Sequence, residues 1–227
     1  MMTGRAPGDY TAPVEDYLKV IYEIERRGSA AATNDIAQQL SIAPASVSGM
    51  VRRLADQGLL EHERYRGVRL TDAGRRVALR TIRRHRVIES YLTHALGYAW
   101  DRVHDEAERL EHAASDELID RMAAAIGEPA TDPHGAPIPT RWGEIDEGPH
   151  LGTIAELVPG DRCRVVRVSD DDARLLRYLG EVGLIPGAEV VLVSRAPFGG
   201  PLALLVDGVE RAIGPTLASH VMIETSG

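Results

Sequence analysis

The nine residues from His104 to His112 hold the side chains best suited to chemistry in this sequence. They read HDEAERLEH and place four good metal ligands at offsets of 0, 4, 7 and 8 residues: His104, Glu108, Glu111 and His112. On an α-helix these offsets share one face, because residues three, four and seven apart stack above one another. Imidazole and carboxylate donors without a thiolate indicate a site for a first-row divalent metal of fairly hard character.

A second pair, His85 and Glu89, repeats the i, i+4 spacing about twenty residues earlier and would supply another wall of a metal site. The alternative is a solvated acidic helix whose carboxylates simply face water. That alternative explains the acids, but not why three of the eight histidines fall at ligand spacing. We therefore expect a metal site built from two packed helices.

A metalloenzyme would also place Glu and His on packed helices. A carboxylate-bridged di-iron protein usually needs a Glu-x-x-His pair on each of two helices, and the spacings to His112 are 1 and 4 instead. The sequence also has no nucleophile–base pair and no phosphate-binding glycine loop. It therefore predicts a protein that is not an enzyme and has no small organic substrate.

The elements before these ligands read as a winged helix-turn-helix. Apolar residues of helical period predict helices over residues 14–26, 33–40 and 44–57, and two short strands over 59–64 and 67–71 follow. Glycine at 28 and 58 ends the first and third helices, and Pro44 suits a first helical turn. Helix, helix-turn-helix and hairpin within about sixty residues make this order fairly specific.

The third of these helices is the predicted DNA-recognition helix. Small and hydroxyl residues on its outward side allow close approach to base edges, and arginines suit phosphates. The alternative is a winged helix used only for protein contacts, with a solvated arginine face. We favour double-stranded DNA as the partner, with contacts from Thr33, Pro44, Ala45, Ser46, Ser48, Gly49, Arg52 and Arg53, and from Arg66 on the wing.

The rest of the chain changes character twice. Helical patterns cover residues 72–96 and 101–126, and the proline-rich stretch 127–153 reads as irregular. Short β-type runs at 165–168, 189–194, 202–206 and 221–224, with a helical turn at 173–182, suggest a small SH3-type barrel. The predicted fold is mainly α within the α+β class. Its expected parts are residues 1–74, a winged helix-turn-helix; 75–142, a helical metal-binding and dimerisation domain; 143–153, a linker; and 154–227, an SH3-like domain.

Charge is divided unevenly along the chain. Net charge is −8, yet residues 1–90 hold 15 basic against 11 acidic residues, whereas residues 91–227 hold 11 against 23. A basic module on an acidic remainder is typical of a protein that meets phosphate at one end and collects cations at the other. There is no long apolar run and no signal-peptide pattern, and the single cysteine, Cys163, fits a reducing cytoplasm. We expect a cytoplasmic protein without a membrane partner.

Several motifs resemble one family closely. EDYLKVIYEIE (15–25), PASVSGMV (44–51), ERYRGVRLT (63–71), the ligand stretch at 103–112 and DPHGAPIP (132–139) resemble the diphtheria-toxin-repressor family of metal-dependent transcription repressors. Within that family the chain is most similar to manganese transport regulators. LGEVGLIPG (179–187) and APFGGP (196–201) resemble the SH3-like domain shared with ferrous-iron transport accessory proteins.

The resemblance implies two metal positions. The primary one would use Asp16, Glu108, Glu111 and His112, and the ancillary one His85, Glu89 and His104. Iron-responsive members carry Met and Cys where this chain has Asp16 and Glu108. Because carboxylates suit Mn²⁺ better than sulfur donors do, the resemblance implies Mn²⁺ as the cofactor, with Fe²⁺ as the alternative. It also implies a homodimer that binds operator DNA.

The chain departs from the family's pattern in two places. Short manganese regulators often have Glu one turn after the aspartate, where this chain has Lys19. A protonated lysine cannot ligate, which favours separate primary and ancillary sites over a close two-metal cluster. Asp170 or Asp172 of the SH3-like domain is a candidate additional ligand, and a loop or helix cap is the alternative for that acidic stretch.

Overall fold

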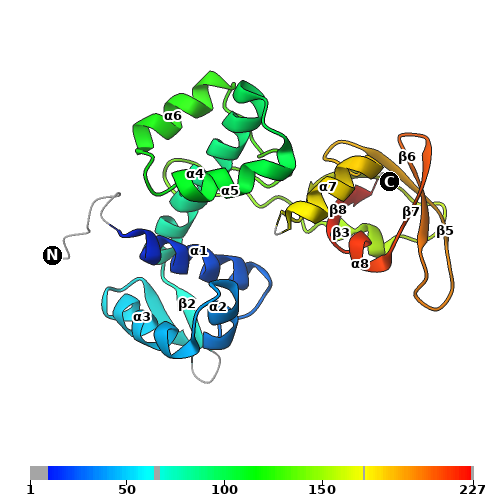
Figure 1. The fold of residues 1–227 in the computed structure, drawn as a ribbon. Coiled ribbons are helices and arrows are strands. Elements are labelled where there is room, and N and C mark those ends of the chain that lie inside the picture. The colour runs from blue at the N-terminus through cyan, green and yellow to red at the C-terminus, as the bar shows by residue number, and fades with distance from the viewer. Residues whose placement is uncertain (1–9, 64–66, 171, 226–227) are drawn as a thin grey trace. The chain divides into compact units, whose positions relative to one another are not determined.

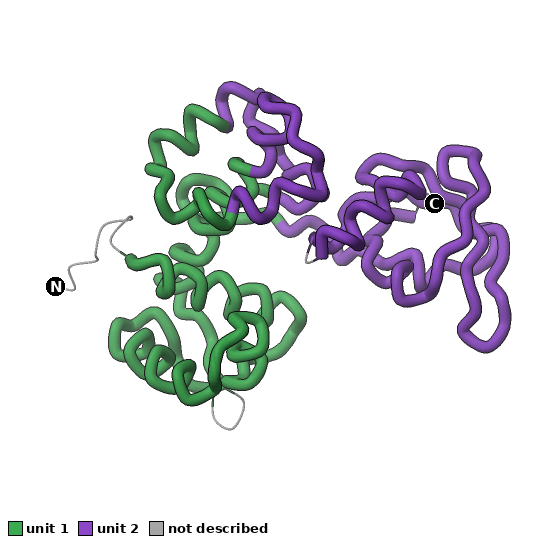
Figure 2. Tube along the Cα trace, in the orientation of Figure 1, with its two compact units in different colours: residues 1–88, 108–122, 138–146 green, residues 89–107, 123–137, 147–227 purple. Residues whose placement is uncertain are grey.

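The computed structural model describes residues 10–63, 67–170 and 172–225. They form two compact units, each assembled from separate stretches of the chain (Figure 2). The first unit takes residues up to 88, then 108–122 and 138–146, and the second takes 89–107, 123–137 and 147 onward. Because neither unit is a continuous segment, the predicted domain boundaries stay a prediction.

The N-terminal part of the first unit is a winged helix-turn-helix (Figure 1). Its elements are α1 (Ala12–Arg26), α2 (Thr33–Gln39), α3 (Pro44–Asp56) and the antiparallel strands β1 (Leu60–Glu63) and β2 (Gly67–Leu70). Proline stands in the first turn of both α1 and α3, where its missing N–H and fixed φ cost nothing. The predicted order of elements is therefore confirmed, with helix ends shifted by one or two residues.

The apolar faces of these helices meet in one core. Leu18, Ile21, Ile36, Val47 and Leu54 are completely buried in it. Gly67 shows how tightly the wing is attached: its φ is +124°, and a Cβ there would lie 2.1 Å from the carbonyl oxygen of Ala31. Only glycine allows this approach, and it lets Ala31 and Val68 exchange two backbone hydrogen bonds.

The predicted helix over 101–126 is broken in the structure. A 3₁₀ turn (Trp100–Arg102) leads into α5 (Val103–Leu110), and α6 (Asp116–Ala125) begins only after a turn at residues 111–115. Ser115 causes the restart, because its hydroxyl accepts a hydrogen bond from Leu118 N as an N-terminal cap does. The continuous-helix prediction was wrong, and Glu111 and His112 consequently lie in a turn rather than on the face of α5. The helix before this stretch, α4 (Asp72–Leu96), runs as predicted.

The second unit contains a six-stranded antiparallel sheet. Its strand order is β3-β8-β4-β5-β6-β7. The bounds are β3 (Gly152–Thr153), β4 (Arg162–Val168), β5 (Glu189–Arg195), β6 (Leu202–Val206), β7 (Val209–Ile213) and β8 (Val221–Thr225), with η2 (Ile154–Glu156), α7 (Ala173–Val182) and α8 (Pro215–Ala218) between them. The sequence prediction missed β3 and β7. Of β7 only Ile213 is buried, so this edge strand carries little apolar pattern.

The sheet and α7 enclose a second core, which includes Leu176, Leu179, Val190 and Leu204. Cys163 is buried there, and burial, followed by the nearby Glu189 and Asp161, raises the pKa of its thiol to about 11. A thiol that stays protonated is unreactive, in agreement with a packing role. None of the described helices is both long and apolar enough to cross a membrane.

Candidate metal centres

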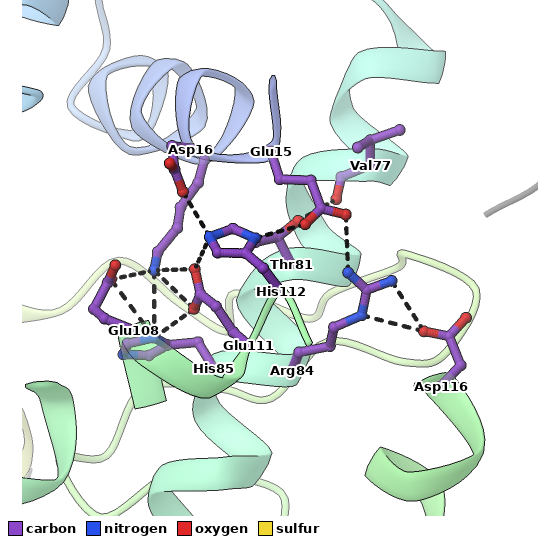
Figure 3. A network of polar contacts seen from close by, with 11 residues as sticks. Glu15, Asp16, Val77, Thr81, Arg84, His85, Glu108, Glu111, His112 and Asp116 are labelled. Carbon is purple, nitrogen blue, oxygen red and sulfur yellow. Dashed lines mark hydrogen bonds and ion pairs between the residues drawn. The ribbon is translucent and has the colours of Figure 1, made fainter. Parts of the chain in front are cut away.

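Asp16, Glu111 and His112 converge on one point in the first unit. One oxygen or nitrogen of each lies within 4.8 Å of the others. Nε2 of His112 is 2.8 Å from Asp16 Oδ1 and 3.3 Å from Glu111 Oε1 (Figure 3). Asp16 comes from α1 and the other two from the turn after α5. Two carboxylates and one imidazole from separate elements are donors that suit a hard first-row divalent ion. We call this set the first centre.

Glu15 supports the first centre from behind, a role that sequence reasoning missed. Its carboxylate lies 2.7 Å from His112 Nδ1 and accepts a 2.9 Å hydrogen bond from Arg84, which in turn donates to Asp116 (Figure 3). Burial opposes its ionisation, but the hydrogen bonds from His112 and Arg84 hold the pKa of Glu15 below its ordinary value. A carboxylate on the outer nitrogen of a ligating histidine fixes the ring's orientation. In the sequence, Glu15 looks only like an acid at a helix N-terminus.

Lys19 extends its ammonium into the same cluster from α1. Nζ donates to Glu108 Oε1 at 2.6 Å and to both oxygens of Glu111 at 3.1 Å. Burial disfavours the charged form, yet Glu111 and Glu108 raise the pKa of Lys19 above its ordinary value. Glu108 therefore lies outside the first centre in this structure, and its Oε1 is held by Lys19. Its predicted role as a metal ligand stays a prediction.

We expect metal binding at the first centre to release a proton. In the metal-free chain, the hydrogen bonds that His112 donates to Asp16 and then to Glu15 raise the pKa of His112 to about 10, so the ring is an imidazolium at pH 7. A ligating imidazole must give up one proton. The apparent metal affinity should therefore rise about tenfold per pH unit below pH 10. Calorimetry of Mn²⁺ binding between pH 6.5 and 8, in buffers of different ionisation enthalpy, measures the protons released.

A proton count near zero in those titrations would mean that His112 is not a ligand.

The ion pairs of His112 with Asp16 and Glu15 also make the stability of the metal-free chain depend on pH, in the direction opposite to that of metal binding. Because the folded-state pKa of His112 is raised, they stabilise the metal-free chain fully below about pH 6.5 and less as the pH rises toward 10.

Four donors converge in the second unit. Glu89, Asp132, His134 and Asp170 each place one ligand atom within 4.8 Å of the others. Glu89 and His134 are completely buried and Asp132 is nearly so. Three carboxylates and an imidazole again fit a hard divalent ion. We call this set the second centre. The sequence indicates Glu89 and Asp170 separately but gives Asp132 and His134 no ligand spacing, although both lie in the DPHG stretch.

The ring of His134 is oriented as in a metal-binding histidine. Nε2 lies 2.9 Å from the carbonyl oxygen of Trp100, and since a carbonyl only accepts, this nitrogen carries a proton and donates it. Nδ1 then faces the carboxylates, 3.8 Å from Glu89 Oε2, and has no hydrogen-bond partner among the described residues. A backbone carbonyl behind the distal N–H is a common support for ligating histidines.

Gly135 explains why Asp132 and His134 reach Asp170. Its φ is +87°, and a Cβ there would lie 2.0 Å from the carbonyl oxygen of Val166 in β4. This close approach lets Val168 N donate to His134 O at 3.0 Å, so the loop lies along the strand that leads to Asp170. Asp172 has a different role, because its carboxylate caps α7 by accepting from Arg174 N.

The three predicted ancillary ligands are distributed over both units. His85 lies in the first unit, where its Nδ1 donates to Glu111 Oε2 at 2.6 Å. Glu89 and His104 lie in the second unit, with His104 Nδ1 3.5 Å from Glu89 Oε1. His85 therefore lies beside a predicted primary ligand and His104 beside Glu89, and the ancillary set itself stays a prediction.

The predicted recognition helix, α3, presents its polar side to solvent. Val47, Val51 and Leu54 are buried. Thr33, at the start of α2, is half-buried. The predicted DNA-contacting residues on α3 are all exposed, namely Pro44, Ala45, Ser46, Ser48, Gly49, Arg52 and Arg53. Arg66 lies outside the described residues. This exposed face has the small side chains and arginines that a major-groove helix needs.

Comparison with known proteins accounts for these features together. Residues 9–68 match the family model of the iron dependent repressor N-terminal DNA binding domain, and residues 71–140 match that of its metal binding and dimerisation domain. Residues 152–225 match the FeoA domain. The iron-dependent repressor IdeR of Mycobacterium tuberculosis is 32% identical over 220 residues, which cover 92% of this chain and 94% of that protein. The chain belongs to the diphtheria-toxin-repressor family. It is a metal-dependent transcriptional repressor and not an enzyme.

Other members are similar over nearly their whole length. The diphtheria toxin repressor of Corynebacterium diphtheriae is 30% identical over 230 residues, covering 95% of this chain and 98% of that protein. A solved structure described as a manganese-dependent transcriptional repressor in complex with manganese has a TM-score of 0.86 and 36% identity, covering 94% of this chain and 100% of that one. The predicted family, the α+β fold with its SH3-like sheet, and the need for a metal ion are confirmed.

Proposed function

We propose that this repressor is activated by Mn²⁺ and that it controls genes of metal-ion homeostasis. The observation that carries the proposal is the first centre, where Asp16 and Glu111 supply carboxylate oxygens and His112 supplies an imidazole. This donor set contains no sulfur, and oxygen-rich sites suit Mn²⁺ better than thiolate or thioether sites do. Such a site does not outbind Zn²⁺ or Cu²⁺ by affinity, so its selectivity comes from geometry and metal availability.

The position of the ligands couples metal to DNA. Asp16 belongs to α1 of the winged helix-turn-helix, whereas Glu111 and His112 follow α5. A bound divalent ion supplies the positive charge that holds these carboxylates together. Asp16 thereby orders α1 and the helices packed on it. By linkage, metal raises the affinity for operator DNA and DNA raises the affinity for metal by the same factor.

We propose that the active form is a homodimer on double-stranded operator DNA. Residues 71–140 match a dimerisation domain, and a two-fold dimer could present its two recognition helices one DNA turn, roughly 34–36 Å, apart. In each chain the exposed side of α3 would enter the major groove, with Arg52 and Arg53 near phosphates. A repressor of transcription acts where the DNA is, so we infer a cytoplasmic location.

The alternative is an iron(II)-dependent regulator of iron uptake. It is favoured by the names of relatives such as IdeR at 32% identity, whereas the structure at 36% identity is described as manganese-dependent. Operator binding titrated with Mn²⁺ and, without oxygen, with Fe²⁺ at controlled free concentration separates the two. Footprinting on genomic DNA under the same conditions would identify the operators. Activation by Fe²⁺ at the lower free concentration would contradict the manganese proposal.

We further propose that the second centre binds a metal ion of its own. Replacing His134 by alanine removes the only nitrogen donor of this set and should lower the bound Mn²⁺ from about two ions per chain to about one. The first centre lies in the other unit and should keep its ion. Metal content measured by equilibrium dialysis checks this result. His150, an exposed histidine outside both centres, provides the matched control for substitution by alanine. Unchanged metal content in the His134 variant would contradict this role.

A further inference from the structure

A small hollow in the first unit is lined mainly by arginines. It is partly open to solvent and is formed by α4, α6 and the segment 138–146. Of the residues that the structure describes, none that belongs to a metal centre lines this hollow, and neither does Arg86, the buried arginine beside His85. We call it the arginine pocket, and its charged lining residues are Arg80, Arg83, Arg84, Arg141, Asp116 and Asp120.

Positive charge is in excess in the arginine pocket. Its lining has four guanidinium groups against two carboxylates. Glu15 also pairs with Arg84, but it is shared with the imidazolium of His112 and so does not remove the excess. The side chains of Arg80, Arg83 and Arg84 are only 22%, 18% and 8% exposed. Because uncompensated charge is costly away from water, the pocket favours an anion.

The hydrogen bonds that orient these arginines leave donors for a further acceptor. Arg80 donates from Nε to a backbone carbonyl oxygen at 3.2 Å and from Nη2 to Asp116 at 3.4 Å. Arg83 donates from Nη1 to a backbone carbonyl oxygen at 3.0 Å and from Nη2 to Asp120 at 3.2 Å. A guanidinium has five N–H groups, and Nη1 of Arg80 and Nε of Arg83 have no hydrogen-bond partner among the described residues. An anion can therefore bind to arginines that are already oriented, without breaking their existing hydrogen bonds.

Asp120 brings two guanidinium groups together. Its Oδ1 lies 3.2 Å from Arg83 Nη2, and its Oδ2 lies 3.3 Å from Arg141 Nη1. Arg141 is further held by Trp142, whose ring centroid is 5.0 Å from the guanidinium carbon. Arginine is the preferred side chain for phosphate-type oxygens. A tetrahedral oxyanion has oxygens that point in several directions, so it can accept from more arginines at once than a planar carboxylate can.

Arg84 connects the arginine pocket with the first centre. Its Nε and Nη2 donate to Asp116, whereas its Nη1 donates to Glu15 at 2.9 Å (Figure 3). Glu15 in turn lies 2.7 Å from Nδ1 of His112. An anion in the pocket adds negative charge on the far side of one guanidinium from this carboxylate. Because opposite charges attract, that negative charge favours a divalent cation at the first centre.

We propose that the arginine pocket binds a small tetrahedral oxyanion, of the phosphate or sulfate type, and that the bound anion strengthens metal binding at the first centre. The site itself is independent of the proposed function. Its effect on metal binding rests on the proposed function, because it requires an ion at the first centre.

The first test titrates the metal-free, full-length chain with sodium phosphate at constant ionic strength and follows the arginine Nε–Hε signals by nuclear magnetic resonance. We expect some of these signals to shift and to saturate at about one anion per chain. Arg83→Gln should weaken binding about tenfold, as expected for the loss of a charge-assisted hydrogen bond. Arg141→Gln should weaken binding in the same direction, and because Arg141 is 57% exposed this variant should leave the fold intact.

Arg121→Gln is the matched control. Arg121 lies on α6, which forms one wall of the pocket, but it pairs with Glu117 on the surface and does not line the pocket. The control should bind phosphate as the parent does. Shifts that do not saturate in the parent would overturn the site, and so would an unchanged affinity in both Arg83→Gln and Arg141→Gln.

Titrations with sulfate and with methyl phosphate distinguish the source of the oxyanion. Equal affinity for phosphate and sulfate would indicate a free inorganic ion, tighter binding of methyl phosphate would indicate a phosphorylated metabolite, and either result supports the site. The phosphates of operator DNA are a different partner. If Arg83→Gln lowered operator affinity but left anion binding unchanged, the arginines would serve DNA and the proposal would be wrong.

The second test measures Mn²⁺ binding in sulfate and in chloride at equal ionic strength, with the free ion followed by electron paramagnetic resonance. His134→Ala is present throughout, so that the second centre does not contribute. We expect sulfate to raise the Mn²⁺ affinity at least about twofold, since charges within about a Debye length still attract. Adding Arg83→Gln should remove this increase.

The outcomes of the second test are distinguishable. The same Mn²⁺ affinity in sulfate and in chloride would overturn the link between the arginine pocket and the first centre. No Mn²⁺ binding in either salt would instead overturn the proposed function.

Discussion

Replacement of His112 by alanine is expected to abolish metal-activated operator binding and to leave a folded protein. A near-complete switch between two states needs a differential affinity of about 10⁴, or about 5.5 kcal/mol. Loss of an outer-shell partner alone typically costs about 10–100-fold in metal affinity, and loss of a direct ligand should cost at least as much. The fold should survive, because Glu15 keeps its hydrogen bond from Arg84.

The measurement is operator affinity with and without Mn²⁺, by fluorescence anisotropy, together with thermal unfolding of the metal-free chain. His150→Ala, an exposed substitution outside both centres, should respond to metal as the parent does. A His112→Ala variant with an undiminished metal response would remove this residue from the first centre.

Exchange of Asp16 for methionine together with Glu108 for cysteine should move activation from Mn²⁺ toward Fe²⁺. These are the residues that iron-responsive relatives are expected to carry at the two positions. A thioether would replace the carboxylate oxygen of Asp16, and a thiolate would replace that of Glu108 in its predicted role as a ligand. Softer donors favour metals later in the divalent series. We expect the ratio of activating Mn²⁺ to Fe²⁺ concentrations to change by at least about tenfold, which corresponds to about 1.4 kcal/mol.

A matched control separates donor type from charge. Asp16→Asn with Glu108→Gln keeps the shapes and oxygen donors but removes both negative charges, so it should weaken activation by both metals without reversing their order. Operator binding titrated anaerobically with each ion gives the comparison. If the Met–Cys variant kept the parent's order of metals, oxygen ligation would not be the origin of the selectivity.

A comparison of the predicted helices and strands with the observed ones shows which features can be predicted from residues that are close together in the sequence. The winged helix-turn-helix was predicted from the helical period of apolar residues, from prolines in the first helical turn and from glycines after helix ends. Each of these signals depends only on residues a few positions apart. The edge strand β7 was missed because only Ile213 in it is buried. The break after α5 was missed because a run of acids and alanines suits a helix by propensity, while the Ser115 cap decides where the next helix starts.

The same limit applies to the metal centres. Spacing in the sequence indicated His112 and Glu111 as ligands, and the structure brings both to Asp16. Spacing in the sequence did not reveal Glu15 behind His112, because nothing near Glu15 in the sequence points to Arg84, 69 residues away. The second centre was equally hidden, since Glu89, Asp132 and Asp170 come from separate stretches that meet only because Gly135 allows its loop to lie against β4.

By itself the sequence determined the kinds of donor, the helices that carry most of them and the family to which the chain belongs, because these depend on residue type and on spacing within one element. The tertiary structure decided which donors share a site, that Glu111 and His112 leave the helix and that Lys19 donates to Glu108 and Glu111. Convergence of side chains is set by how distant elements pack together, and no local period in the sequence contains that information.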